Sequence, residues 1–281
     1  MTSRRWTVKP LARAWALGSL FLGTGCSLHG PLLRDDAGAV ERIQTITLHK
    51  RPVELHLASR RGEPTGAPLV LYVTGDGGWR GADPLVFRTL VQWGYPAAGM
   101  EARSYLDHLG DLAEKATPRR LARDYAAILV HARRELGLAA ATPVVLVGFS
   151  RGAGLAVLAA SQRRLRRHVL GVVAVALTQE EDELRLEPAG TTTSGPGVSD
   201  TIDPYQVLPR LGSLPLTVIQ STHDHYVAAA DARRLFGEDT PSRRLVAIES
   251  DGHTFGGSRD KLLEALRAAL VWIAGAPPPS F

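Results

Sequence analysis

The sequence predicts an α/β fold with a doubly wound, mostly parallel sheet. Short and nearly continuous apolar runs recur along the chain, as in strands that are buried on both faces of a sheet. Helical patterns separate these runs, and that alternation favours helices on both faces. A chain of 281 residues with a hydrophobic content of 44% can also bury one large core.

The first predicted elements form an antiparallel hairpin at one edge of the sheet. Residues 45–49 and 53–57 alternate apolar and polar side chains, and Lys50-Arg51-Pro52 lies between them. Further strands are expected at 68–73, 96–100, 142–148, 171–177, 214–219 and 244–248. Helices are expected at 84–93, 118–135, 152–165, 227–236 and 259–274.

One predicted connection is much longer than the others. Residues 178–212 follow the sixth strand and include an acidic run, with Glu180 and Glu181, and a stretch rich in Thr, Ser and Gly. Loops of this length in compact domains are usually functional or disordered. A lid-like insertion over the site and a solvated surface insertion are both open interpretations.

The N-terminus has the pattern of an export signal. Basic residues precede an apolar stretch at 14–25, which at ~12 residues is too short to span a bilayer comfortably. Cys26 follows directly, and a lone cysteine at this position predicts the lipid attachment site of a lipoprotein. The pair Arg4-Arg5 also resembles a twin-arginine signal. Cleavage to a soluble periplasmic protein, or an uncleaved or cytosolic chain, are the alternatives.

The charge balance gives little support to nucleic-acid binding. The formal net charge is +5, but without residues 1–25 the chain holds 29 basic and 28 acidic side chains. No basic stripe with interleaved aromatic residues remains.

The predicted elements divide the chain into four parts. They are an export signal at 1–25, a tether at 26–43, one α/β domain at 44–275 and a disordered tail at 276–281.

The segment Gly148-Phe149-Ser150-Arg151-Gly152 is the strongest indication of chemistry. It lies between a predicted buried strand and a helix, which is the context of a nucleophile elbow. Such a turn strains the serine backbone and projects its hydroxyl above the sheet, while the glycines avoid collisions. Ser150 is therefore the candidate nucleophile. The alternative is a serine in an ordinary β-to-α turn.

A serine nucleophile needs a base and an acid that orients the base. Asp224 and His253 each follow a predicted strand, in the order serine, acid, histidine that this architecture requires. We expect His253 to act as general base and Asp224 to orient it. Asp231 and Asp251 are poorer acids, because one falls in a helix and the other is too close to His253 in sequence.

An oxyanion hole needs two backbone donors. The N–H of Arg151, directly after the nucleophile, is the first candidate, and Asp76 or Gly77 in the loop after the third strand supplies the second. Trp79 at the end of that loop is expected to wall the pocket or simply to pack. The loop is rich in glycine, but no Gly-Lys-Ser/Thr follows, so a phosphate-binding P-loop is excluded.

No metal or other cofactor is expected. His223 and His225 flank Asp224, but the sequence offers no second ligand cluster with a convincing spacing. The partners that fit are a membrane lipid or a small ester substrate. Envelope or secretion proteins are possible partners, and the sequence does not indicate an oligomeric state.

Two stretches resemble the VirJ/AcvB family of bacterial virulence proteins. They are Tyr72-Val-Thr-Gly-Asp-Gly-Gly-Trp-Arg80 followed by Asp83, and Gly148-Phe-Ser-Arg-Gly-Ala153. The resemblance extends from about residue 67 to 274. It implies an exported α/β-hydrolase fold, and it implies hydrolysis of aminoacyl-phosphatidylglycerol, in which lysine or alanine is esterified to the lipid headgroup. Other members of the family are tied to type IV secretion.

Together with the signal pattern that ends at Cys26, the resemblance favours a periplasmic protein, anchored to the membrane through that cysteine. For such a substrate, Glu180 and Glu181 are candidates to receive the ammonium group, and a solvated acidic loop without a ligand is the alternative. The chain departs from the family pattern at Arg151 and in the loops that carry Asp224 and His253. Those departures leave the three catalytic candidates intact. A general periplasmic carboxylesterase and a non-catalytic scaffold for secretion components remain the other interpretations.

Overall fold

The computed structural model describes residues 38–61, 66–110, 117–179 and 202–275. The expected export signal, Cys26, most of the tether, Glu180, Glu181 and the tail lie outside these ranges. All described residues belong to one unit of the chain. Within the described part of the chain, no helix is both long and apolar enough to span a bilayer.

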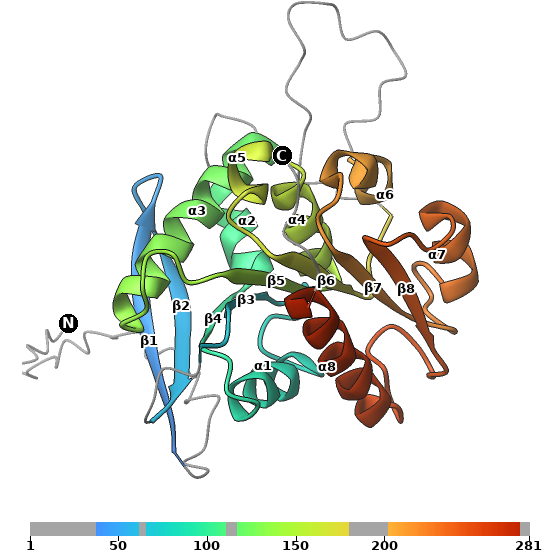
Figure 1. The fold of residues 1–281 in the computed structure, drawn as a ribbon, viewed down its shortest axis with the longest axis horizontal. Coiled ribbons are helices and arrows are strands. Elements are labelled where there is room, and N and C mark those ends of the chain that lie inside the picture. Colours follow the sequence, from blue (N-terminus) through green and yellow to red (C-terminus); the bar gives the residue numbers. More distant parts are fainter. Residues whose placement is uncertain (1–37, 62–65, 111–116, 180–201, 276–281) are drawn as a thin grey trace, which may run out of the picture. The chain divides into compact units, whose positions relative to one another are not determined.

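An eight-stranded sheet forms the centre of the domain, with the order β1-β2-β4-β3-β5-β6-β7-β8 (Figure 1). Strands β1 and β2 pair antiparallel, β2 pairs antiparallel with β4, and every other neighbouring pair is parallel. The predicted mostly parallel α/β sheet is therefore confirmed. The strands are β1 (Ala39–Leu48), β2 (Arg51–Arg60), β3 (Leu69–Val73), β4 (Ala97–Met100), β5 (Val144–Phe149), β6 (Gly171–Val175), β7 (Leu216–Ser221) and β8 (Arg243–Ile248).

Helices cover both faces of the sheet. One face packs against α1 (Asp83–Gln92) and α8 (Arg259–Gly275), as Figure 1 shows. The strand residues divide accordingly, and in β3 alternate side chains enter opposite cores. The other face carries α2 (Ala102–Gly110), α3 (Pro118–Glu135), α4 (Arg151–Ala160), α5 (Arg163–Arg166), α6 (Pro204–Val207), the 3-10 helix η1 (Leu208–Leu211) and α7 (Ala229–Phe236).

The hairpin is longer than predicted. Strand β1 begins at Ala39, so residues 39–43 belong to the sheet and not to a tether. They pair with the end of β2 through residue 60, and this pairing satisfies the backbone groups that face β2. The turn falls at His49-Lys50, where both residues have positive φ, as a two-residue hairpin turn requires.

The long connection also differs from its prediction. Residues 204–211 form α6 and η1 instead of loop, and Tyr205, Leu208 and Leu211 are buried. Asp203 caps α6 by accepting a hydrogen bond from the Tyr205 N–H at 2.8 Å. Helix α2 was likewise not expected. All three helices are short, and short helices give a weak periodic signal.

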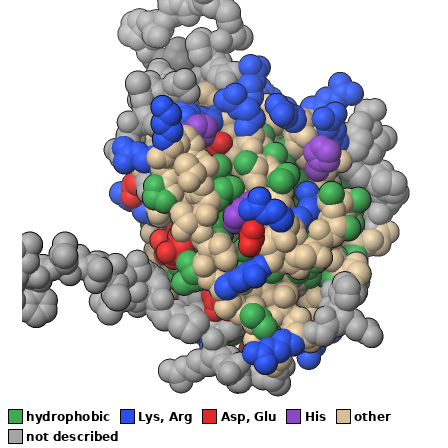
Figure 2. Space-filling model, turned by 90° about the vertical axis from the view of Figure 1, so that its left-hand side faces the viewer, with side chains coloured by type: hydrophobic (Ala, Val, Ile, Leu, Met, Phe, Trp, Pro, Cys, Tyr) green, Lys and Arg blue, Asp and Glu red, His purple; other side chains and the backbone are tan. Residues whose placement is uncertain are grey.

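Figure 2 shows the molecule from the hairpin side, where Lys and Arg side chains are spread among uncharged ones. Strand β1 is the edge of the sheet, and its Val40 and Ile43 are about 40% exposed. At the opposite end of the sheet order, β8 forms the second edge. The parallel strands between these edges all point the same way, so the loops after β3, β5, β7 and β8 emerge at one end of the sheet.

Candidate active site

Ser150 occupies the turn between β5 and α4. Its φ of 52° and ψ of −120° lie in a strained region for a residue with a side chain. The two flanking glycines are required, because a Cβ at Gly148 would overlap the Gly152 carbonyl, and one at Gly152 would overlap the Val73 carbonyl. The turn is held by a hydrogen bond of 2.8 Å from the Ser150 N–H to the Val175 carbonyl. This is the geometry of a nucleophile elbow.

The structure brings the three candidate catalytic side chains together. His253 Nε2 lies 2.7 Å from Ser150 Oγ, and His253 Nδ1 lies 2.7 Å from Asp224 Oδ2. With Nδ1–H donating to the carboxylate, Nε2 is free to accept the serine proton. Asp224 is 4% exposed and His253 is 9% exposed, so water competes little with either bond.

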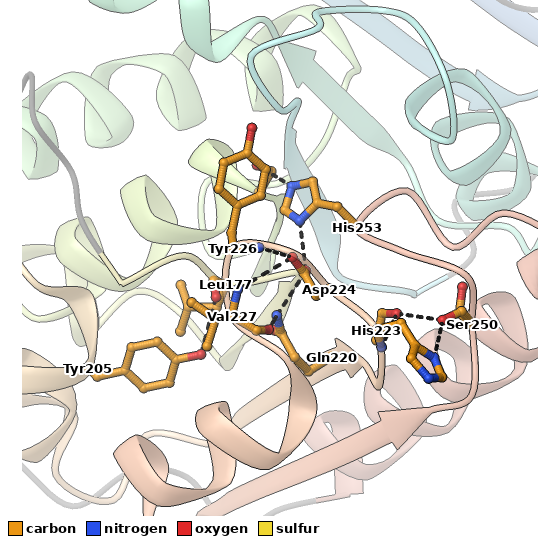
Figure 3. Close-up of polar contacts among 11 residues, drawn as sticks. Leu177, Tyr205, Gln220, His223, Asp224, Tyr226, Val227, Ser250 and His253 are labelled. Atoms are coloured by element: carbon orange, nitrogen blue, oxygen red, sulfur yellow. Dashed lines mark hydrogen bonds and ion pairs between the residues drawn. The ribbon is translucent and has the colours of Figure 1, made fainter.

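Asp224 is fixed by further donors on both carboxylate oxygens. Oδ1 accepts from the Tyr226 N–H at 2.9 Å and the Val227 N–H at 3.4 Å. Oδ2 accepts from Gln220 Nε2 at 3.0 Å in addition to His253. Figure 3 shows Asp224 between His253 and Gln220, with Tyr226 beside the imidazole. The bond from the Tyr226 N–H to the Asp224 side chain forms an Asx turn. Aspartate favours such turns because its side chain can accept from the N–H two residues further along the chain.

Aromatic rings surround the imidazole of His253. Its centroid lies 4.7 Å from the Tyr226 ring, 5.7 Å from the His225 ring and 5.9 Å from the Phe149 ring, each at a steep angle. Tyr226 is 64% exposed and lines the cavity, so it forms part of the wall beside the base. Neither Tyr226 nor Gln220 is predicted from the sequence as a residue of the site.

The competing acids do not contact His253. Asp231 pairs with Arg234 on α7, and Asp251 is exposed. His223 Nδ1 lies 3.1 Å from the Ser250 carbonyl oxygen, so that histidine is engaged with the neighbouring loop. Among the described residues, no three His, Cys, Asp or Glu side chains are placed to hold a metal ion.

A cavity of about 670 Å³ opens above Ser150. Its lining includes Ser150, His253, Arg151, Asp76 and Gly77, so the expected oxyanion donors border the same space as the nucleophile. Within the described part of the chain, the N–H groups of Asp76 and Gly77 donate to no protein acceptor. The Arg151 guanidinium forms an ion pair with the Asp76 carboxylate, which ties the elbow to the loop after β3.

Trp79 does not wall this cavity. It is 8% exposed, and its ring packs in the core against His56, Tyr72 and Phe87, with centroids 4.6, 6.0 and 5.3 Å away. The packing alternative is therefore the correct one for this residue. The side chain of a tryptophan in a glycine-rich loop can point into the cavity or into the core. The backbone here directs Trp79 into the core between the sheet and α1.

Asp83, the first residue of α1, lines the same cavity and is 5% exposed. Burial, together with the negative charge of Glu101, raises the pKa of Asp83 to about 7, although hydrogen bonds from Tyr72 and Gly75 act against this rise. A buried carboxyl with a perturbed pKa beside a cavity is a candidate functional group. In the sequence, Asp83 stands out only as part of the family resemblance.

The expected substrate-binding pair cannot be placed in this site. Glu180 and Glu181 lie outside the described residues. The two residues before them, Thr178 and Gln179, line the cavity.

A family model described as bacterial virulence protein VirJ matches residues 68–186. The resemblance to VirJ read from the two motifs is thereby confirmed over this range. The matched range includes the loop after β3, the elbow and Ser150, and it ends before Asp224 and His253. No curated protein matches the chain.

Solved structures of α/β-hydrolases share the fold. A protein assigned as a dienelactone hydrolase from Klebsiella pneumoniae subsp. pneumoniae is 15% identical, with a TM-score of 0.62 over 84% of this chain and 99% of its own. Est1E from Butyrivibrio proteoclasticus is 16% identical, with a TM-score of 0.58 over 83% and 99%. Esterase 2 from Thermogutta terrifontis, phosphorylated by paraoxon, is 17% identical, with a TM-score of 0.55 over 85% and 96%. The chain has an α/β-hydrolase fold.

Proposed function

We propose that the protein is a serine hydrolase that cleaves carboxylic esters. The observation that carries the proposal is the hydrogen-bonded chain from Asp224 through His253 to Ser150, with 2.7 Å at each step. The chain ends at a strained serine on the floor of a cavity. No purely structural role requires a strained serine to face an oriented imidazole.

In the first half of the reaction, Ser150 Oγ bonds to the ester carbonyl carbon while its proton passes to His253 Nε2. Asp224 stabilises the imidazolium that forms. The carbonyl oxygen becomes an oxyanion beside the N–H groups of Arg151 and of Asp76 or Gly77. His253 then gives its proton to the alcohol oxygen, the carbon–oxygen ester bond breaks, and an acyl-enzyme remains.

In the second half, water replaces the alcohol. Its oxygen attacks the acyl carbon while His253 Nε2 takes one of its protons, and the second oxyanion forms in the same place. The proton then passes to Ser150 Oγ as the acyl bond breaks. The products are a carboxylic acid and an alcohol, and the enzyme returns to its starting state.

The proposed substrate is aminoacyl-phosphatidylglycerol, with lysine or alanine as the acyl group. The match to the VirJ family model over residues 68–186 supports this choice, together with the signal-like N-terminus that ends at Cys26. An enzyme anchored on the periplasmic side by a lipid attached to Cys26 would lie next to membranes that hold aminoacyl-phosphatidylglycerol. Glu180 and Glu181 remain the proposed site for the substrate ammonium group.

A general carboxylesterase is the second candidate, because part of the cavity wall is apolar. Phe149, Val227 and Tyr226 line the same cavity as Ser150, beside polar and charged side chains, and their surface suits a simple acyl chain. The non-catalytic scaffold for secretion components is the outcome left if neither ester is cleaved.

One assay separates the three functions. Purified protein is incubated with vesicles that contain lysyl- or alanyl-phosphatidylglycerol and, separately, with p-nitrophenyl butyrate, beside the Ser150→Ala variant. Release of free lysine or alanine that is lost in the variant supports the lipid substrate. Cleavage of the p-nitrophenyl ester alone indicates a general carboxylesterase. No cleavage of either ester contradicts both enzymatic functions.

A further inference from the structure

The loop after β3 carries the candidate oxyanion donors Asp76 and Gly77, and carboxylates hold it at two points. Near its start, the Gly75 N–H donates to Asp83 Oδ1 at 3.2 Å. At its end, the Trp79 N–H donates to Glu101 Oε1 at 3.2 Å. Within the loop, the Gly78 N–H donates to the Gly75 carbonyl at 3.1 Å and the Arg80 N–H donates to the Gly78 carbonyl at 2.7 Å. The Asp76 carboxylate also pairs with the Arg151 guanidinium.

Asp83 connects this loop to the sheet. The same Oδ1 that accepts from Gly75 also accepts from the Tyr72 hydroxyl at 2.8 Å. Tyr72 belongs to β3 and is fully buried, so its hydroxyl is held by the core. The carboxylate therefore transmits the position of the strand to the first peptide of the loop.

Asp83 is a costly way to make this connection. Burial raises its pKa to about 7, so the folded protein penalises its charged form. A packed apolar side chain at such a position often serves stability as well or better. A group that costs stability and borders a cavity is typical of a functional site.

We propose that Asp83 is a positioning residue that aims the N–H groups of Asp76 and Gly77 at the oxyanion. The inference rests on the proposed function, because these donors matter only if Ser150 forms a tetrahedral intermediate. Asp83 acts through the loop and need not touch the substrate. Its contribution appears in the transition state, where a donor displaced by a fraction of an ångström loses much of its effect.

The test measures the rate of fluorophosphonate labelling of Ser150 and the kinetics of p-nitrophenyl butyrate cleavage for the wild type, Asp83→Ala and Asp83→Asn. We expect Asp83→Ala to lower the labelling rate and kcat by roughly 10²-fold, as loss of an oxyanion donor does. KM should stay within about threefold of the wild type, because ground-state binding is retained. Asp83→Asn keeps an acceptor oxygen at the same place and should restore most of the rate.

Asp124→Ala is the matched control. Asp124 is 4% exposed and accepts a tyrosine hydroxyl, that of Tyr105 at 2.8 Å, but it does not line the cavity. Its loss should lower the melting temperature without slowing the labelling of folded protein. If Asp83→Ala does not fold, Asp83→Ser is tested instead, and the same fall in labelling rate and kcat is expected. The serine oxygen lies one bond closer to the backbone than the carboxylate oxygen, so the Gly75 N–H loses its acceptor.

The outcomes separate this inference from the function on which it rests. A wild-type protein that neither reacts with the fluorophosphonate nor cleaves the ester overturns both. A reactive wild type beside an equally reactive Asp83→Ala overturns the positioning role alone. An Asp83→Asn variant as slow as Asp83→Ala also contradicts it, since the acceptor oxygen would then be insufficient.

Discussion

Asp224 and Asp83 are two buried carboxylates that approach Ser150 from opposite sides of the elbow strand. Asp224 follows β7, beyond β6, whereas Asp83 follows the loop after β3, which pairs with the other side of β5. Asp224 accepts hydrogen bonds on both oxygens, including one from the catalytic imidazole. Asp83 accepts from Tyr72 and Gly75 on one oxygen.

The difference shows two ways in which a buried acid can serve one reaction. A carboxylate that balances an imidazolium benefits from donors on every side, because they keep its charge and its orientation constant. A carboxylate that only aims a loop needs one well-placed acceptor oxygen. In the second case the negative charge destabilises the folded state, because the buried carboxylate has lost its hydration. The raised pKa of Asp83 reflects this cost.

The largest effect is expected at Asp224. In Asp224→Asn, kcat for ester cleavage should fall by roughly 10⁴-fold, because the amide no longer holds His253 in the tautomer that accepts the serine proton. Steady-state kinetics with p-nitrophenyl butyrate measures this change. Asp231→Asn, a nearby surface substitution on α7, is the control and should retain full activity. Equal losses in the two variants would contradict the assignment of the acid.

The second effect concerns stability at Asp83. The folded protein raises the pKa of this carboxyl from 3.8 to about 7, so between these values the folded state binds more protons than the unfolded state. Its contribution to the free energy of unfolding therefore falls as pH rises through this window, by up to ~4 kcal/mol, and is level above about pH 7. Asp83→Asn removes this dependence.

Urea unfolding of both proteins across the window checks this expectation. The stability of Asp83→Asn relative to the wild type should increase steadily from about pH 4 to about pH 7 and then stay constant. A difference that is the same at every pH would show that Asp83 is not the group that binds the extra proton.

A third effect is expected at Gln220, which does not line the cavity but donates to Asp224 Oδ2 and to the carbonyl of Val227, a residue of the cavity wall. Gln220 is fully buried, and Gln220→Leu removes one donor from Asp224 Oδ2. We expect a loss of ~1–3 kcal/mol in the free energy of unfolding and a fall of about tenfold in kcat, much less than for Asp224→Asn. Chemical denaturation and steady-state kinetics measure the two. An activity loss as large as that of Asp224→Asn would contradict the supporting role.

The smallest effect is expected at Tyr72. Tyr72→Phe removes one of the two hydrogen bonds to Asp83 Oδ1 and leaves the bond from Gly75 in place. Stability should fall by about 1 kcal/mol, and the labelling rate of Ser150 should change by less than about threefold. Thermal unfolding and fluorophosphonate labelling measure these changes. A loss of labelling as large as that of Asp83→Ala would show that the tyrosine, not the carboxylate, positions the loop.

The sequence contained enough to predict the sheet and the three triad candidates. Buried strands were visible as apolar runs, and catalytic groups in this architecture follow such runs directly, so Ser150, Asp224 and His253 could be located by their place after β5, β7 and β8. The order of the three along the chain reduced the choice further. No information about distance was needed.

The residues that support this site could not be predicted in the same way. Gln220 and Asp83 matter because they hydrogen-bond to Asp224 and to the Gly75 N–H. The spacing of apolar residues along the chain does not predict such contacts. Trp79 was given two interpretations because the direction of a loop side chain depends on the backbone turn. Strand β1 extended through residues 39–43 because its partner β2 is long enough to pair with them.

Covalent labelling is the most direct test of the proposed chemistry. The wild-type protein is treated with a fluorophosphonate, digested, and analysed by mass spectrometry beside Ser150→Ala and Asp224→Asn. The adduct is expected on Ser150 in the wild type, at a rate greatly reduced in Asp224→Asn, and absent from Ser150→Ala. An unmodified Ser150 in the folded wild-type protein, or an adduct that survives in Ser150→Ala, would contradict its role as the nucleophile.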